Sequence, residues 1–368
     1  MATEPAMGIA QRAFSAPDEG LLEEIKAKKM APYYEYIAPK VGWTIDGSLL
    51  AAMKDANGAE LAFLQAAKEE AEKNLGDMEV LDALFAIAAF HARIGDKAGT
   101  FEACDAIALK PKVSTGKKID ALMGKLRIAL FYLEVDKDVL AETKKLADSG
   151  GDWDRNNRLG VYEAIVAIVN RDFKAAAKLL LSGVATFTCT ELCDYSDFVF
   201  YAVLTNLLSL SRPELKKKVV EGPEILQIIK QIPHLRELVV SLYDCEYARF
   251  FSNLLALEDR IKQDRYLAPH FRYLIREMRV LAYTQFLDAY KTVTLKAMAA
   301  VFGVSIPFLD QELAHFISCG RLNAKIDKVD LVVETNRPDS KSAHYQTIIK
   351  QGDLLLNQIQ KLARKVSI

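Results

Sequence analysis

The sequence lacks the features that support secretion or membrane insertion. Its 368 residues include only five cysteines, odd in number and scattered, which is typical of a protein kept in a reducing compartment. No apolar run approaches the roughly 18 to 20 residues that a membrane span needs. The polar, acidic start of the chain shows no signal-peptide core. We therefore expect a protein of the cytoplasm and nucleus, with no membrane partner.

Charge of one sign is also lacking. The chain carries 48 lysines and arginines against 49 aspartates and glutamates, a net charge of −1. A protein that binds duplex nucleic acid is expected to be basic, because neutralising phosphates provides most of its affinity. We therefore expect no nucleic-acid partner. Hydrophobic residues make up 51% of the chain, enough for one extended or two compact folded domains.

Motifs for catalysis are lacking as well. The segment Ser114–Lys118 resembles a phosphate-binding loop, but it has neither the earlier glycine nor a Ser/Thr after the lysine. Cys189 and Cys193 lie four residues apart without a nearby histidine or a second cysteine pair, so ordinary packing is favoured over metal binding. His270 stands at a predicted helix start, where a histidine is usually structural. We expect no enzyme activity, no metal and no cofactor.

What the sequence does contain is a helical repeat. Three segments each have a helix, a short turn and a second helix, and their turn aspartates Asp96, Asp136 and Asp172 are 40 and 36 residues apart. This period is typical of tetratricopeptide-like solenoids, whose helical pairs stack to bury their apolar faces. Each turn aspartate is expected to cap the second helix of its pair. Further helices are predicted over residues 195–210, 224–231, 235–264 and 269–290.

A winged helix is predicted after the repeats. Thr294 can cap a short helix that Gly303 ends, and a second helix starts at Ser305 and closes at Gly320. The β-rich run Ala324–Thr335 supplies the wing. Ile326, Leu331 and Val333 alternate, so one face is expected to pack on the helices. The outer strand would pair with the sheet of a neighbouring subunit. A proline at Val332 would remove one backbone N–H donor from that strand.

One long amphipathic helix is predicted from Asp339 to the C-terminus. Its apolar positions follow a 3-4 spacing of about three heptads, with Gly352 as the exception, and Leu354 and Leu356 widen this face. The helix either folds back on its own domain or joins a multi-helix bundle with other chains, and its length favours the bundle. The members of the seam apart from Gly352 are Tyr345, Ile348, Leu355, Ile359, Leu362 and Val366.

A charged corner, Gly150–Arg158, contains Trp153. The tryptophan either anchors a joint of the repeat or docks a partner. Under the docking hypothesis, reversing the charge of Arg155 and Arg158 should weaken a contact without unfolding the repeat, because surface charges contribute only about 0 to 1 kcal/mol to stability. Together with the seam, Ile326 and Val332, these residues form our predicted protein interface.

The chain resembles the proteasome-lid members of the PCI family, which is shared by the proteasome, the COP9 signalosome and a translation initiation factor. The resemblance covers nearly the whole chain from about residue 21 and departs in the N-terminus and around Lys110–Lys117. It is carried by segments such as Met30–Glu35, Gly150–Arg155, Ala268–Tyr273, Lys325–Val329, Val333–Lys341 and Gly352–Asn357. The last two favour the proteasome over the signalosome paralogue, which stays the alternative.

The resemblance implies a scaffold within a hetero-oligomer. Such subunits join through their winged helices and send their terminal helices into a common bundle, while another subunit holds the deubiquitinating centre. The implied partners are other lid subunits and the deubiquitinase module, with the ATPase ring and a small acidic lid protein as further candidates. A nucleic-acid-binding winged helix is a less favoured alternative.

We thus predict a mainly α-helical fold, a tetratricopeptide-like solenoid followed by a PCI winged helix and a long terminal helix. The expected domains are an N-terminal extension over 1–30, the solenoid over 31–190, the PCI domain over 191–335 with its winged helix from 291, and the bundle helix over 336–368.

Overall fold

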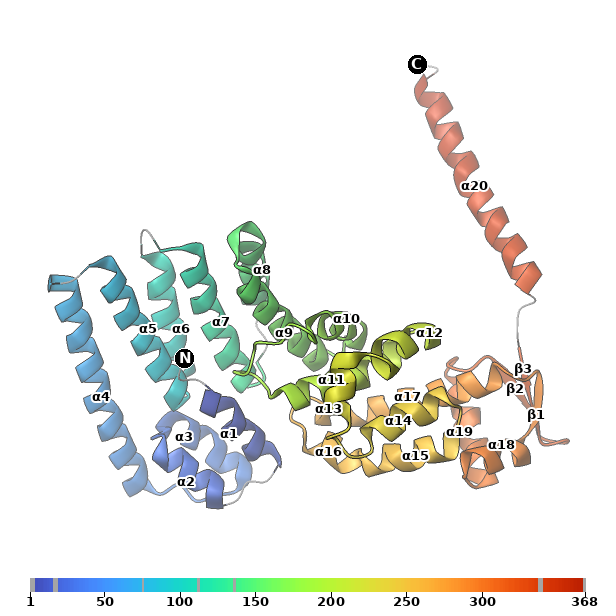
Figure 1. Cartoon of the computed structure of the whole chain (residues 1–368), viewed down its shortest axis with the longest axis horizontal. Coiled ribbons are helices and arrows are strands. Elements are labelled where there is room, and N and C mark those ends of the chain that lie inside the picture. The colour runs from blue at the N-terminus through green and yellow to red at the C-terminus, as the bar shows by residue number, and fades with distance from the viewer. Residues whose placement is uncertain are drawn as a thin grey trace. The chain divides into compact units, whose positions relative to one another are not determined.

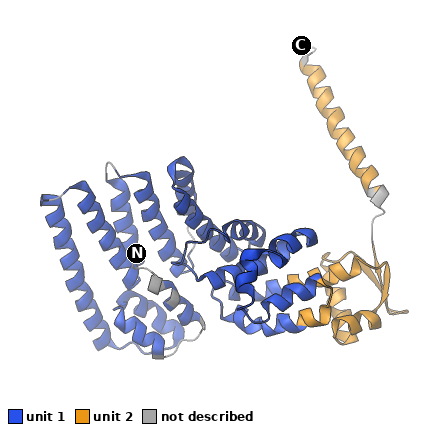
Figure 2. Ribbon diagram, viewed as in Figure 1, with its two compact units in different colours: residues 1–243, 252–275 blue, residues 244–251, 276–368 orange. Residues whose placement is uncertain are grey.

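The computed structural model describes residues 4–15, 19–74, 76–110, 113–134, 137–336 and 340–366. In these ranges the chain consists of helices and one three-stranded sheet (Figure 1). It forms two compact units (Figure 2): unit 1 contains residues 1–243 and 252–275, and unit 2 contains residues 244–251 and 276–368. The prediction of a mainly helical protein with a small β wing is confirmed.

Stacked helices form the body of unit 1, and each helix from α4 to α10 packs on its successor (Figure 1). At two of the predicted turns the aspartate caps the following helix: Asp96 accepts the Gly99 N–H and Asp172 accepts the Ala175 N–H, each at 3.1 Å. Asp136 lies outside the described residues. The repeat is confirmed, and its helices are α4 (Gly47–Asn74), α5 (Asp77–Ile94), α6 (Lys97–Leu109), α7 (Thr115–Phe131), α8 (Lys137–Gly150), α9 (Trp153–Val169), α10 (Phe173–Gly183) and α11 (Tyr195–Ser209).

The N-terminal residues are built into unit 1. They form α1 (Glu4–Ser15) and α2 (Glu19–Ala27), and α3 (Ala31–Val41) follows. Ile9 and Leu21 are completely buried. The Gln11 side chain donates to the Gln263 carbonyl at 2.8 Å and accepts the Arg265 N–H at 3.1 Å. The region predicted as an extension thus takes the form of packed helices, while the domain bounds themselves stay a prediction.

Short helices complete unit 1, and two helices, α15 (Tyr247–Ala256) and α17 (Phe271–Leu287), contribute residues to both units. The single helix predicted over 235–264 is wrong. Cys245 has a left-handed φ of +64°, which an α-helix cannot continue through, so the stretch breaks there; a second break at Leu257 gives three helices in all. The remaining elements are α12 (Arg212–Leu215), a π-helix (Lys216–Val220), α13 (Pro223–Ile229), α14 (Leu235–Tyr243), α16 (Glu258–Gln263) and a 3-10 turn (Ala268–His270).

Unit 2 has an aromatic centre beneath a helix-turn-helix. Phe302 of α18 (Leu295–Phe302) lies 4.7 Å from Tyr247 and 4.9 Å from Tyr283, measured between ring centroids. The Thr294 hydroxyl caps α18 by accepting the Ala297 N–H at 3.3 Å, and Gly303 ends it with a φ of +66°. Helix α19 (Ile306–Ser318) follows. The predicted helix-turn-helix is therefore confirmed.

The wing is an antiparallel sheet of three strands in the order β1-β3-β2. They are β1 (Thr292–Thr294), β2 (Ala324–Asp327) and β3 (Val332–Thr335). Strand β1 was not predicted. Val333 is fully buried opposite Ile326, as predicted, but Leu331 lies in the turn before β3 with a φ of +53° and is 52% exposed. The predicted alternation therefore fails at Leu331.

The last element is α20 (Ser340–Val366). No single helix among the described residues is long and apolar enough to cross a membrane; α18 and α19 meet that test only as a pair bent by 102°.

Candidate functional site

The candidate phosphate-binding, catalytic and metal-binding residues of the sequence have structural roles. Ser114 caps α7, because its hydroxyl accepts the Lys117 N–H at 3.4 Å. One ring nitrogen of His270 lies 3.0 Å from the Val169 carbonyl. Burial lowers the pKa of His270, which favours the neutral ring. Cys189 is buried, and burial raises the pKa of its thiol to about 12. Within the described ranges no three His, Cys, Asp or Glu side chains gather as metal ligands do.

The predicted seam on α20 is exposed. Tyr345, Ile348, Leu355, Ile359 and Leu362 keep between 55% and 66% of their surface open to solvent. The side chain of Val366 lies outside the described part of the chain. A Cβ added at Gly352 would meet no atom within 4 Å. The described seam side chains are therefore exposed in the isolated chain, which favours the bundle over the fold-back alternative.

The apolar residues of α20 form one broad sector. At about 100° per residue, the positions from Leu362 to Ile349 span about 140° of the helix circumference. Leu356 lies near one margin of this sector, whereas Leu354 falls outside it, so only Leu356 widens the face as predicted. A two-stranded coiled coil uses a narrower a/d seam. The sector therefore has the width of a helix that packs against more than one neighbour.

Among the described residues, the outer edges of β1 and β2 pair with no further strand, and Val332 is on neither edge. Strand β3 is central and pairs with both β1 and β2. The Asn336 N–H donates to the Asn323 carbonyl at 2.9 Å. In an antiparallel pair, hydrogen-bonded and non-hydrogen-bonded residue pairs alternate along the strands. Val332 therefore directs its N–H toward β2, whereas Ile326 directs its own N–H away from β3. The placement of Val332 on the outer strand is therefore wrong. Ile326 is the predicted interface residue that presents backbone groups at an edge.

The charged corner differs from its prediction. Trp153 is the first residue of α9 and is 64% exposed, so it does not anchor a joint. Arg155 donates two hydrogen bonds to Asp120, at 2.9 and 2.8 Å. Arg158 donates to both carboxylate oxygens of Glu191, at 2.8 Å each. The two arginines are therefore internal ion-pair partners. The premise that they are free surface charges is wrong, and reversing their charges is now expected to destabilise the repeat.

Glu191 is the centre of a half-buried ionic cluster. Arg127, Arg158 and the Tyr162 hydroxyl all donate to its carboxylate, which is only 13% exposed. Burial alone would raise the pKa of Glu191, but the guanidinium of Arg127, with Arg158 and Tyr162, holds it below the ordinary value. The cluster ties the loop after α10 to helices α7 and α9.

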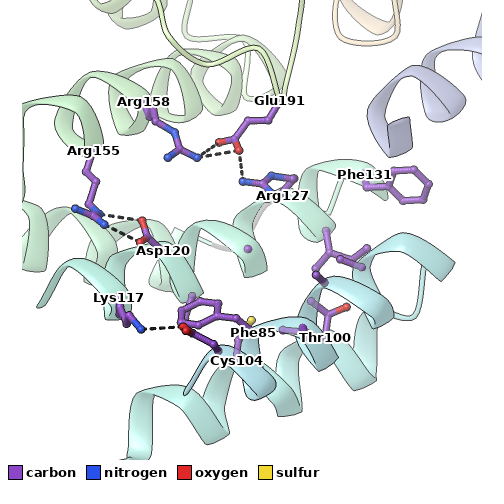
Figure 3. A pocket seen from close by; sticks show the side chains of 18 of the residues that line it. Phe85, Thr100, Cys104, Lys117, Asp120, Arg127, Phe131, Arg155, Arg158 and Glu191 are labelled. Atoms are coloured by element: carbon purple, nitrogen blue, oxygen red, sulfur yellow. Dashed lines mark hydrogen bonds and ion pairs between the residues drawn. The ribbon is translucent and has the colours of Figure 1, made fainter. Parts of the chain in front are cut away.

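A cavity of about 840 Å³ lies beside this cluster in unit 1 (Figure 3). Its wall comes mainly from α5, α7 and α9. Figure 3 shows Arg158 and Arg127 directed toward Glu191, with Arg155 directed toward Asp120 along the same wall. Sequence reasoning missed the cavity, because its apolar floor consists of alanines and a glycine that read as ordinary helix residues.

The stacked helical pairs, the winged helix and the exposed terminal helix together define a helical-repeat protein of the PCI type. Three family profiles match: "26S proteasome subunit RPN7" over residues 46–218, "PCI domain" over 235–337, and "26S proteasome regulatory subunit RPN7/PSMD6 C-terminal helix" over 344–366. The chain belongs to the family of 26S proteasome non-ATPase regulatory subunit 6, or RPN7.

Relatives of the chain match along nearly its whole length. The 26S proteasome non-ATPase regulatory subunit 6 homolog of Arabidopsis thaliana is 47% identical over 95% of this chain and 90% of its own length. The Dictyostelium discoideum 26S proteasome non-ATPase regulatory subunit 6 is 41% identical over 99% and 98%. The Saccharomyces cerevisiae 26S proteasome regulatory subunit RPN7 is 36% identical over 100% and 91%. These relatives do not favour the signalosome alternative.

Proposed function

We propose that this chain is a non-catalytic scaffold subunit of the 26S proteasome regulatory-particle lid and supports ubiquitin-dependent protein degradation. The observation that carries the proposal is the exposed apolar sector of α20. Burying one large aliphatic side chain contributes roughly 1.5 to 3 kcal/mol, and α20 leaves several of them in water. A helix with this face gains its stability by packing with helices of other chains. The matching RPN7 C-terminal helix profile supports this role for α20.

The wing is the second proposed contact. The free edge of β2 carries backbone groups that another sheet can pair with. We infer that neighbouring PCI subunits of the lid join side by side here and that their terminal helices then share one bundle. The deubiquitinase module is a further partner, and the ATPase ring and a small acidic lid protein are candidates. The proposed location is the cytoplasm and nucleus, in a hetero-oligomer.

Truncation of α20 tests the bundle. A chain that ends at residue 349 loses the sector from Gly352 onward, whose side chains touch little of the chain itself. We expect its thermal unfolding midpoint to stay within about 2 °C of the full chain, because exposed side chains contribute little to stability. Its incorporation into a reconstituted lid, measured by native mass spectrometry, should be lost.

A matched variant separates the apolar sector from the presence of the helix. Replacing Leu355, Ile359 and Leu362 with aspartate should abolish incorporation, whereas aspartates at the polar positions Gln346, Asn357 and Gln360 should not. A truncated chain that unfolds at a much lower temperature yet still assembles would contradict the proposal. Salt-sensitive binding of the full chain to duplex DNA would instead favour a nucleic-acid function.

Purification of the native complex is the broader test. Mass spectrometry of what co-purifies with the chain should find the ATPase-ring and protease subunits. Recovery of signalosome subunits without them would overturn the assignment to the proteasome lid.

A further inference from the structure

The cavity in unit 1 has no part in the contacts proposed for α20 and the wing. Its volume of about 840 Å³ lies within the range of about 300 to 1,000 Å³ that is usual for ligand sites. Its floor is made by small side chains, including Ala89, Ala92 and Gly124, with Phe85 beside them. The space between α5 and α7 extends as far as the buried Cys104 of α6. An apolar side chain of a ligand would fit over this floor.

The cations in the wall are already paired with carboxylates, and the described wall has five acidic side chains against four basic ones. Among the described wall residues, Lys117, Arg127, Arg155 and Arg158 each bind an acidic side chain, and none of the four side chains is more than 29% exposed. The Asp82 side chain is 72% exposed even though Lys117 binds it at 3.0 Å. The wall is therefore slightly acidic, and Asp82 presents an exposed carboxylate to a ligand.

Trp153 adds a second cation-binding element next to this wall, although it is not itself a lining residue. It stands between Asp152 and Asp154, which both line the cavity, and its indole is 64% exposed. The Asp152 carboxylate accepts the backbone N–H of Trp153 at 2.8 Å, and the Asp154 carboxylate accepts the Thr188 hydroxyl at 2.9 Å. A carboxylate can accept more than one hydrogen bond. An exposed indole face attracts guanidinium and ammonium groups. The aromatic ring and the carboxylates thus favour the same ligand charge.

We propose that this cavity binds an extended peptide segment of a partner protein, with an apolar side chain on the Ala89–Gly124 floor and an arginine or lysine at Trp153. The apolar floor lies inside the cavity and the exposed indole lies outside its lining. A ligand that contacts both must therefore extend out of the cavity, as an extended peptide does. This peptide site is additional to the scaffold contacts and is independent of assembly through α20.

The test uses the full chain and fluorescein-labelled heptapeptides. The probe has a central leucine flanked by arginines; matched probes have glutamates at the flanks or serine at the centre. Fluorescence polarisation should show binding of the arginine-leucine probe that weakens as salt rises, since exposed charges are screened. Both matched probes should bind at least tenfold more weakly.

Variants locate the binding. Ala89→Leu fills the floor and should weaken the arginine-leucine probe at least tenfold, while Ala98→Leu, on the exposed side of α6, should not. Trp153→Ala should weaken it about two- to fivefold, the range of an exposed cation–π contact; Phe63→Ala, an equally exposed aromatic on α4, is its control. If Ala89→Leu lowers the unfolding temperature, Ala86→Leu, at an exposed wall position, replaces it.

Three results would each overturn the proposal. The first is no binding of the arginine-leucine probe at millimolar concentration. The second is equal binding of the glutamate-flanked probe. The third is unchanged binding in a folded chain whose cavity floor has been filled.

Discussion

Replacing Glu191 with glutamine tests the reasoning about the ionic cluster. The substitution keeps the shape of the side chain but removes the charge that Arg127 and Arg158 share. Breaking a buried ion pair by removing one partner costs about 3 to 5 kcal/mol. Glutamine can still accept hydrogen bonds and Arg158 is 25% exposed, so we expect a loss of about 2 to 3 kcal/mol here, at or below the lower limit of that range.

The assay is thermal unfolding of the full chain by calorimetry. A loss of this size should lower the unfolding midpoint of the transition that includes unit 1 by about 4 to 12 °C, since 1 kcal/mol corresponds to roughly 2 to 4 °C in a domain of this size. Glu221→Gln is the control, because Glu221 pairs with Lys216 at 3.6 Å on an exposed surface. Such surface pairs contribute about 0 to 1 kcal/mol.

The pH dependence gives a second readout. The pKa of Glu191 is lower in the folded chain than in the unfolded chain. Its contribution is therefore fully present above the unfolded pKa of about 4.3 and is lost as the pH falls through the folded pKa. The difference between the original chain and Glu191→Gln should stay constant from pH 8 to pH 5 and shrink below about pH 4. Equal unfolding midpoints at pH 7 would refute the assignment of the cluster as a stabilising element.

Two further predictions concern unit 2. Ile326→Pro removes an edge N–H of β2, whereas Ile326→Ala removes the side chain and keeps the N–H, so only the proline should prevent pairing with a neighbouring subunit in a lid reconstitution; equal effects of the two variants would exclude edge pairing. Gly303→Ala should lower the free energy of unfolding by about 1 kcal/mol in urea titrations, because φ is +66° there and a Cβ would lie 3.4 Å from that of Ala248; an unchanged value would show that the turn relaxes without strain.

Features set by neighbours in sequence were predictable. Asp96 and Asp172 cap the helices that follow them, and Thr294 and Gly303 bound α18, because the groups that each satisfies lie within a few residues. The spacing along α20 likewise depends only on helix periodicity.

Features set by distant residues were not predictable. The sequence around Arg158 predicts a free surface charge, because its partner Glu191 is 33 residues away. Strand β1 has only three residues, and it is a strand because β3, about 40 residues later, pairs with it. The central position of Val332 follows from that same pairing. The cavity floor depends on the distance between α5 and α7, and the identity of a single alanine in either helix does not predict that distance.

The long-range contacts of α1 affect the order in which the chain folds during synthesis. Gln11 bonds to residues 252 and 254 positions later in the chain. At about 5 to 20 residues per second, a ribosome needs roughly 13 to 50 s to make that stretch. The first helix can contact α2, α5 and α7 soon after they are made, but the part of its contact surface that α16 provides is made much later. Closure of unit 1 is therefore a late event, and a nascent chain stalled before residue 263 carries an N-terminal helix that lacks its Gln11 contacts.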